Sequence, residues 1–344
     1  MSKNLTEDLA PLGQEIVPPE EAATLQEMIT AMQAGAGKPL GPNGLSLRQG
    51  HAYMHGCVKA VFKVDAGLPE ALKVGVFKNE VSYPAWLRFS NASASPVKTP
   101  DTAPDMRGLG IKLMKVPGRK ILETEKDAET QDFSLLTHPT FTSRNVAEFS
   151  GFVKAVSNPD QAVQGAYFGN PANTALLGRL GAANKVHRHL LEETYFSTTP
   201  YRLGGEGSAI KFQMRPSSAK PLEVVSITDD NYLRSNLVKT LAEQAVIFDF
   251  LIQFQANAAT EPIEDPTVEW KTEWLKVATI TLPVQVFDTP EQNKLGESLS
   301  FSPWHSLPEH APLGGINRAR KPLYEVLAAL RDEQSGLPHQ EPRS

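Results

Sequence analysis

The sequence between residues 57 and 282 switches repeatedly into short apolar or alternating runs. The runs lie at residues 57–64, 85–90, 110–114, 209–214, 246–255 and 275–282, and the first four are bounded by Gly, Pro, Asn or Asp. Runs of this length between turn residues predict β-strands. The clearest alternation places on one face Phe248, Phe250, Ile252 and Phe254. A chain with this pattern must pair its strands into a sheet or barrel.

Helical spacing of apolar residues interrupts and follows these strands. It occurs in residues 20–34, 146–156, 233–244 and 317–331. The first of these segments has an i, i+3, i+4, i+7 stripe made of Leu25, Met28, Ile29 and Met32. Strands at irregular intervals, with helices between and after them, indicate an α+β chain. We therefore expect an antiparallel β-barrel with inserted and C-terminal helices.

The composition favours one large domain preceded by an arm. Of the 344 residues, 40% are hydrophobic and 21% are charged, so the chain can bury a sizeable core. We expect residues 1–45 to form an N-terminal arm and helix, because residues 1–19 are polar and contain three prolines. A Gly- and Pro-rich linker follows at residues 37–44. No strong shift in composition divides residues 46–344, which predicts one barrel domain.

Charge, cysteine content and hydropathy exclude several classes of protein. The 34 basic and 39 acidic residues give a net charge of −5, which argues against a nucleic-acid partner. Cys57 is the only cysteine, so an intrachain disulfide and a multi-cysteine metal site are excluded. The acidic start is unlike a signal peptide, and the most apolar stretch, residues 245–254, is too short to span a bilayer. We expect a cytoplasmic protein without stable membrane insertion.

Several segments combine residue types that suit chemistry, although each has an ordinary explanation. They are residues 47–56, 86–93 with 105–112, 131–141, and 301–310 with 316–324. His51 and His55 are four residues apart, but the glycines beside them disfavour a helical metal site. Arg88 in an apolar strand can pair with a buried carboxylate. Arg320 and Tyr324 have the i, i+4 spacing of any packed helix face.

Together and in this order, these segments resemble the catalase superfamily, and most closely its short branch of catalase-related haem peroxidases. The resemblance runs from about residue 47 to residue 331. The family's R-x-x-H-A motif is matched by residues 48–52, its V-R-F-S strand by 87–90 and its D-x-R-G motif by 105–108. Its proximal R-x-x-x-Y motif is matched by Arg320 and Tyr324. Arg331 occupies the position of an arginine expected seven residues after that tyrosine.

The resemblance implies haem b, iron protoporphyrin IX, as the cofactor. It assigns Tyr324 as the axial iron ligand, which must be a phenolate although free tyrosine has a pKa of about 10. The iron and Arg320 would both stabilise that anion. The haem propionates would be held by Arg48, Arg88 and Arg331, because the forked guanidinium group suits a carboxylate.

On the opposite haem face, the resemblance assigns His51 as the general base that handles the peroxide proton. Phe141 and Phe149 match aromatic positions that wall the haem pocket, and they fit ordinary core positions equally well. His55 is an alternative for the base, and His138 could also approach the pocket. We favour His51, because it alone completes the R-x-x-H-A motif.

Three departures from the family pattern bear on activity. Thr137 stands where catalases carry a distal asparagine, and a hydroxyl lacks the reach and the second polar atom of an amide. We therefore expect weak catalase activity. Gly50 replaces a bulky apolar residue and leaves more room beside His51. Twenty residues follow Tyr324, so we expect no counterpart of the C-terminal helical domain of long catalases.

The sequence thus predicts a haem peroxidase that reduces hydrogen peroxide or organic hydroperoxides with small organic electron donors. Two alternatives stay open. One is an enzyme that rearranges or cleaves fatty-acid hydroperoxides, like an allene oxide synthase or lyase, and the other is a haem-binding protein with little turnover. Expected partners are peroxide and a small organic donor, and a homodimer or homotetramer is compatible with the resemblance.

Overall fold

The computed structural model describes residues 11–34, 40–41, 44–93, 97–337 and 341–342. Its strands are β1 (Met54–Val64), β2 (Ser82–Asn91), β3 (Arg107–Met114), β4 (Thr130–Leu136), β5 (Tyr195–Phe196), β6 (Tyr201–Arg202), β7 (Ala209–Pro216), β8 (Val246–Phe254) and β9 (Trp274–Leu282). Its α-helices are α1 (Glu21–Ala34), α2 (Val146–Ser157), α3 (Gln161–Phe168), α4 (Thr174–Ala183), α5 (Tyr232–Glu243), α6 (Pro290–Ser298) and α7 (Gly315–Ser335). Short 3₁₀ helices cover Glu70–Leu72, Gly75–Phe77, Glu123–Glu125, Pro171–Asn173, Leu190–Glu192 and Pro308–His310.

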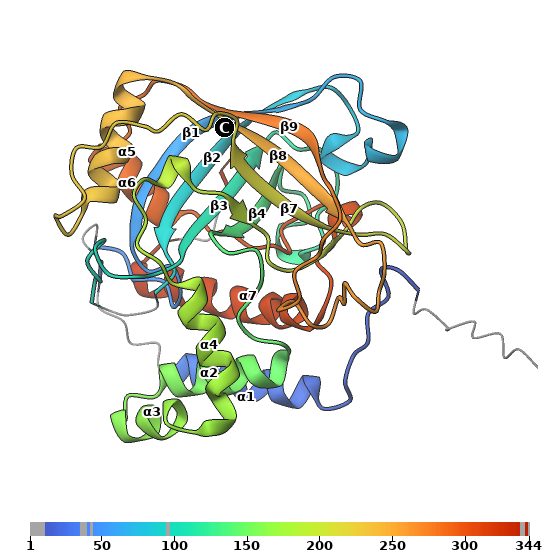
Figure 1. Ribbon diagram of the computed structural model, residues 1–344, viewed down its shortest axis with the longest axis vertical. Coiled ribbons are helices and arrows are strands. Elements are labelled where there is room, and N and C mark those ends of the chain that lie inside the picture. The colour runs from blue at the N-terminus through green and yellow to red at the C-terminus, as the bar shows by residue number, and fades with distance from the viewer. Residues whose placement is uncertain (1–10, 35–39, 42–43, 94–96, 338–340, 343–344) are drawn as a thin grey trace, which may run out of the picture.

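The strands form a closed antiparallel barrel (Figure 1). Their order is β5-β4-β3-β2-β1-β9-β8-β7, and pairing of the two-residue strand β5 with β7 closes the ring at eight strands. β6 adds a ninth strand beside β7. The closure is short, because β5 pairs with β4 at one position and with β7 at two. The α+β barrel with inserted and C-terminal helices that the sequence predicts is therefore confirmed.

The barrel interior is filled by aromatic side chains. Phe62, Phe133, Phe212 and Phe250 come from four strands and are each at most 2% exposed. Phe133 lies 4.9 Å from Phe212 and 5.1 Å from Phe250, measured between ring centroids. Side chains alternate between the two faces of a strand, so residues next to the inward positions point outward. The polar side chains of the wall are thus directed away from this core.

Helix α7 crosses one end of the barrel and separates it from a second helical layer (Figure 1). On its far side, α7 packs with α1 and α2 around a small apolar cluster made of Met28, Val146, Val153, Ala319 and Leu323. Helices α5 and α6 instead pack against β1 at the side of the barrel. This arrangement places α7 between two layers, with one face toward the barrel.

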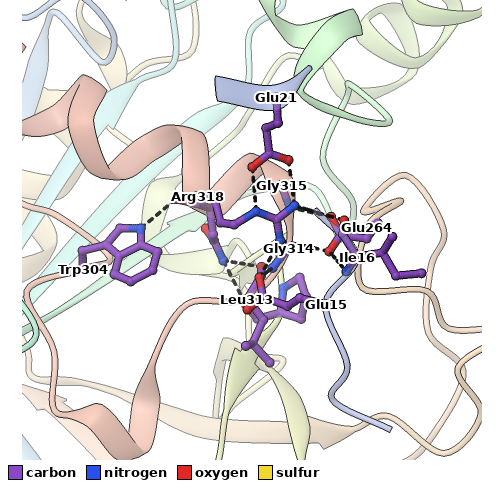
Figure 2. Close-up of polar contacts among 11 residues, drawn as sticks. Glu15, Ile16, Glu21, Glu264, Trp304, Leu313, Gly314, Gly315 and Arg318 are labelled. Atoms are coloured by element: carbon purple, nitrogen blue, oxygen red, sulfur yellow. Dashed lines mark hydrogen bonds and ion pairs between the residues drawn. The ribbon is translucent and has the colours of Figure 1, made fainter. Parts of the chain in front are cut away.

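The start of α7 is held by one arginine and three carboxylates (Figure 2). The Arg318 guanidinium donates to Glu15 at 2.6 Å, to Glu21 at 2.7 Å and to Glu264 at 2.9 Å. Glu264 also accepts from the backbone amide of Gly315 at 2.8 Å. A carboxylate at a helix N-terminus complements the exposed amides and the helix dipole. The network ties the N-terminal arm and the loop around Glu264 to the first turn of α7.

The predicted strands and helices are all present, with ends shifted by a few residues. Parts of the predicted arm and linker, residues 1–10, 35–39 and 42–43, lie outside the described residues. The division of the chain at residue 45 stays a prediction. Among the described helices, none has the length and apolar character needed to cross a membrane.

Candidate active site

His51 lies just before β1, and its side chain packs against the end of β2 and the start of β3. Its backbone is left-handed, with φ at +56°, a conformation that residues other than glycine rarely adopt. Its Nδ1 lies 2.9 Å from the carbonyl oxygen of Asn91 and 3.2 Å from Oγ of Ser90. A Cβ added to Gly108 would come within 2.2 Å of Nδ1. The imidazole therefore needs glycine at position 108 of β3.

These contacts define the tautomer and the charge of His51. A carbonyl oxygen only accepts hydrogen bonds, so the contact with Asn91 places the proton on Nδ1 and leaves the lone pair on Nε2. Burial lowers the pKa of His51 to about 4, and the positive charge of Arg88 adds to the effect. The side chain is therefore a neutral base at pH 7.

Three arginines from different parts of the chain converge on the C-terminal end of α6. Arg88 donates to the Glu297 carboxylate at 3.0 Å, and Arg48 donates to the Glu297 carbonyl at 3.2 Å. Arg331 donates to the carbonyl of Ser298 at 3.2 Å. Helix C-terminal carbonyls carry partial negative charge and accept cations. The sequence-predicted set Arg48, Arg88 and Arg331 is thus brought together.

Within the described part of the chain, positive charge exceeds negative charge in this arginine cluster. There, two carboxylates, Glu297 and Asp332, lie beside the three guanidinium groups. Burial holds the pKa of Arg48 well below its ordinary value, and the charges of Arg331 and Arg88 lower it further. A ligand that carries carboxylates would relieve this repulsion, so the cluster suits the propionates of haem.

Arg320 and Tyr324 lie one turn apart on α7. Nη1 of Arg320 donates to Oγ1 of Thr199 at 3.2 Å and to Oδ1 of Asn317 at 3.1 Å, rather than to Tyr324. Tyr324 is half-buried, and its hydroxyl has no hydrogen-bond partner among the residues that the structure describes. The phenol oxygen is therefore available to a ligand, as an axial haem ligand must be.

Phe141 and Phe149 form one half-buried aromatic pair next to Arg320. Their ring centroids are 5.4 Å apart in an edge-to-face arrangement. The Arg320 guanidinium lies 5.1 Å from the centroid of Phe141. Phe149 also packs against the apolar cluster between α1, α2 and α7. Phe141 therefore belongs to the surroundings of Arg320, whereas Phe149 serves both this pair and the helical core.

The structure separates the alternative histidines from His51. His55 is fully buried and lies 3.9 Å from Oδ1 of Asp101, measured at its Nδ1. His138 makes its Nδ1 contact within its own turn, 3.0 Å from the carbonyl oxygen of Thr140. His51, in contrast, lies within electrostatic range of Arg48, Arg88 and Arg320, whose charges all lower its pKa. Of these three arginines, only Arg88 also acts on His55, so His51 is the histidine that lies within range of the candidate groups on both β2 and α7.

Thr137 is buried next to the start of β3, where its hydroxyl is already engaged. Its Oγ1 accepts a hydrogen bond of 2.9 Å from the backbone amide of Arg107. The sequence did not predict this hydrogen bond. It also did not predict that Asn91 and Gly108 would contact His51, or that Thr199 would contact Arg320. Ser90 and Gly108 lie inside the matched motifs, so the motifs contained a signal for them. Asn91 lies inside the segment 86–93 that the sequence singles out, although no role was expected for it, and nothing in the sequence singles out Thr199.

Comparison with known proteins places the fold among catalases. A fungal catalase aligns with a TM-score of 0.65 and 17% identity over 83% of this chain and 60% of its own. Catalase A from Saccharomyces cerevisiae gives 0.64 and 16% over 83% and 61%, and a bacterial catalase gives 0.61 and 17% over 84% and 57%. The chain thus spans about 60% of the length of these catalases. No protein-family model and no curated protein matches it. The protein has a catalase-like fold.

Proposed function

We propose that the protein is a haem-dependent peroxidase that reduces hydrogen peroxide or organic hydroperoxides with small organic electron donors. Overall, the peroxide takes two electrons and two protons from the donor. An organic hydroperoxide then yields its alcohol and one water, and hydrogen peroxide yields two waters. The observation that carries the proposal is the electrostatic grouping of neutral His51 with Arg48, Arg88 and Arg320. These residues come from the segment before β1, from β2 and from α7.

The donor set fits haem b. Among the described residues, the cluster Arg48, Arg88 and Arg331 carries three guanidinium groups beside the carboxylates of Glu297 and Asp332, and guanidinium forks bind propionates. Tyr324 offers a phenol oxygen that is free to become the axial ligand. Arg320 lies one turn earlier on α7, and we propose it as the cation that stands beside that oxygen when haem is bound. When bound, haem supplies the redox-active iron at which peroxide is reduced.

His51 would move the proton of the peroxide. Its Nε2 carries the lone pair, so it can accept a proton from one peroxide oxygen and return it to the departing oxygen. The carbonyl of Asn91 keeps the ring oriented throughout, because Nδ1–H remains bonded to it. A pKa of about 4 keeps the side chain unprotonated and competent at neutral pH.

Two further observations bear on the substrate. The single side-chain oxygen of Thr137 accepts from the Arg107 amide, so the hydroxyl hydrogen is the one donor left to hold a second hydrogen peroxide. This supports a peroxidase with weak catalase activity. Gly50 is exposed, and a Cβ added to it would meet nothing within 4 Å, so the surface at this position, next to His51 in the chain, is open to solvent. An enzyme that rearranges fatty-acid hydroperoxides stays the second candidate.

The test is to load the purified protein with haem and follow peroxide with and without an organic donor. We expect stoichiometric haem binding, a spectrum of the phenolate-ligated type, and donor oxidation that depends on peroxide. A fatty-acid hydroperoxide that disappears without consuming donor would support the rearranging enzyme instead. A bound haem with neither reaction would leave a binding protein, and failure to bind haem would overturn the proposal.

A further inference from the structure

Arg320 is a buried cation held by neutral groups. It is 7% exposed and pairs with no carboxylate within the part of the chain that the structure describes. Its Nη1 donates instead to Oγ1 of Thr199 and Oδ1 of Asn317, at 3.2 Å and 3.1 Å. A buried charge is usually paired with an opposite charge, because desolvation is costly. The neutral partners of Arg320 therefore need an explanation.

The amide of Asn317 is itself locked in place. Its Nδ2 donates to the carbonyls of Pro200 at 2.9 Å and Leu313 at 3.1 Å. Because both amide hydrogens are used, Oδ1 must face Thr199 and Arg320. The backbone carbonyl of Asn317 also accepts from the Trp304 indole at 2.6 Å, a contact that reaches the first turn of α7 (Figure 2). Asn317 thus presents a fixed oxygen to the guanidinium.

Thr199 is presented by a strained turn. The preceding residue, Thr198, has φ at +60°, which is unfavourable for a β-branched side chain. Ser197 holds the turn, since its Oγ accepts from the amide of Phe212 at 3.0 Å and donates to the carbonyl of Thr199 at 2.9 Å. Strained backbone persists only where its surroundings determine it. The turn therefore aims Oγ1 of Thr199 at Arg320.

We propose that Thr199 and Asn317 are positioning residues that hold the Arg320 guanidinium beside Tyr324 through neutral oxygens and leave its positive charge available to the phenolate. This inference rests on the proposed function. A carboxylate in the same place would keep the geometry but cancel the field of the guanidinium at the phenol oxygen. A neutral amide and a hydroxyl give the geometry without that loss.

The charge of Arg320 reaches the buried Tyr201. Burial raises the pKa of Tyr201 to about 12, and the positive charge of Arg320 opposes this rise. Tyr324 also affects the pKa of Tyr201, so Arg320 and Tyr324 both lie within electrostatic range of Tyr201. The same charge acts on His51. Arg320 therefore acts on the groups of the candidate site.

One test is Asn317→Asp, which keeps the size of the side chain and adds one negative charge beside Nη1. The variant also loses the two amide hydrogen bonds to Pro200 and Leu313, so its stability is measured alongside. We expect the apoprotein to bind haem about tenfold more weakly or worse, and the absorption spectrum of the loaded protein to move away from the phenolate type. Thr199→Val, which removes one acceptor, should give a smaller change in the same direction. Thr199→Ser keeps the hydroxyl and should restore both haem affinity and spectrum.

The thermal unfolding midpoint of each apoprotein separates positioning from general damage. If Asn317→Asp fails to fold, the comparison of Thr199→Val with Thr199→Ser decides alone. Wild-type affinity and spectrum in both Asn317→Asp and Thr199→Val would overturn this inference while leaving the proposed function intact. A wild-type protein that binds no haem would overturn both.

Discussion

Nδ1 of His51 lies 2.9 Å from the backbone carbonyl oxygen of Asn91, the last residue of β2. Strand β2 therefore orients the candidate base His51 through its backbone. The same strand contributes Arg88, whose side chain belongs to the arginine cluster. Nη1 of Arg88 also donates to the carbonyl of His51 at 3.2 Å. The end of β2 thus controls the position of His51 from both sides of the residue. A catalytic group held by rigid strand ends needs little reorganisation during a reaction.

Replacing His51 by alanine should slow the reaction with peroxide by a factor of about 10²–10⁴, the usual contribution of a general acid–base group. His55→Ala should leave that rate unchanged, because the His55 ring lies beside Asp101 and outside the range of Arg48 and Arg320. Stopped-flow kinetics on equal amounts of haem-loaded protein measures both variants. If His55→Ala is the variant that loses the reaction with peroxide, the assignment of the base is wrong.

Tyr324→Phe should abolish most haem binding or change the haem spectrum completely, because it removes the phenol oxygen that we propose as the axial ligand. Haem titration followed by absorption measures the effect. Tyr167→Phe on α3 is the matched control and should retain haem. Full haem content with an unchanged spectrum in Tyr324→Phe would show that the axial ligand is another residue.

Each of the variants Arg48→Ala, Arg88→Ala and Arg331→Ala should weaken haem binding by about 2–5 kcal/mol, because a buried propionate loses its cationic partner. The exposed Arg119, which pairs with Glu123 four residues later, is the control, and Arg119→Ala should bind haem as the wild type does. Equilibrium titration of the apoproteins gives the four affinities. Wild-type affinity in all three cluster variants would place the propionates elsewhere.

The alternation and helical spacing of the sequence predicted the long strands and α7, because these signals extend over several turns or residues. The same signals could not predict barrel closure, which depends on the two residues of β5. They also missed β4, where Gln131 and Asp132 are buried although polar, since Lys112 pairs with Asp132 at 2.7 Å. A tertiary ion pair of this kind overrides the local pattern.

Motif spacing predicted the candidate arginines and His51, but not what holds them. Asn91 contacts His51 across 40 positions, and Thr199 contacts Arg320 across 121. Contacts over such separations are set by strand pairing and by the position of α7, which a single sequence does not reveal. The site residues that the resemblance assigns therefore stay predictions, and their supporting hydrogen bonds could not be predicted from the sequence.

Acid should destabilise the folded protein through buried neutral histidines. Burial lowers the pKa of His310 to about 4, and its Nε2 accepts from the Val76 amide at 3.1 Å, so protonation would break that bond. The unfolded state has a pKa near 6.5 and binds a proton that the folded state does not, between about pH 6.5 and pH 4. Stability contributed by this group is therefore lost as pH falls through that window.

The loss should amount to about 1.4 kcal/mol per pH unit for each such histidine. His310→Gln keeps an acceptor for the Val76 amide without a titrating ring. Urea unfolding of the apoprotein at several pH values should thus give a smaller acid slope for His310→Gln than for wild type. Equal slopes between pH 6.5 and 4 would contradict the assignment of His310 as a neutral buried group.

Thr137→Asn should raise oxygen evolution from hydrogen peroxide relative to peroxide-dependent donor oxidation. Threonine has one side-chain oxygen, and it accepts from the Arg107 amide at 2.9 Å. Asparagine can accept the same bond with Oδ1 and still offer two hydrogens on Nδ2. Those hydrogens could hold a second hydrogen peroxide beside His51, which catalase turnover requires and reduction of one peroxide by a donor does not.

An oxygen electrode and a dye-oxidation assay on the same haem-loaded samples give the ratio of the two activities. Thr137→Val is the control, because it removes the acceptor and adds no donor, so its ratio should not exceed that of the wild type. The reaction of the first peroxide should stay close to the wild-type rate in Thr137→Asn, since His51 is untouched. A wild-type protein that evolves oxygen faster than it oxidises any donor, or a ratio that Thr137→Asn leaves unchanged, would show that the hydroxyl of Thr137 does not limit the catalase reaction.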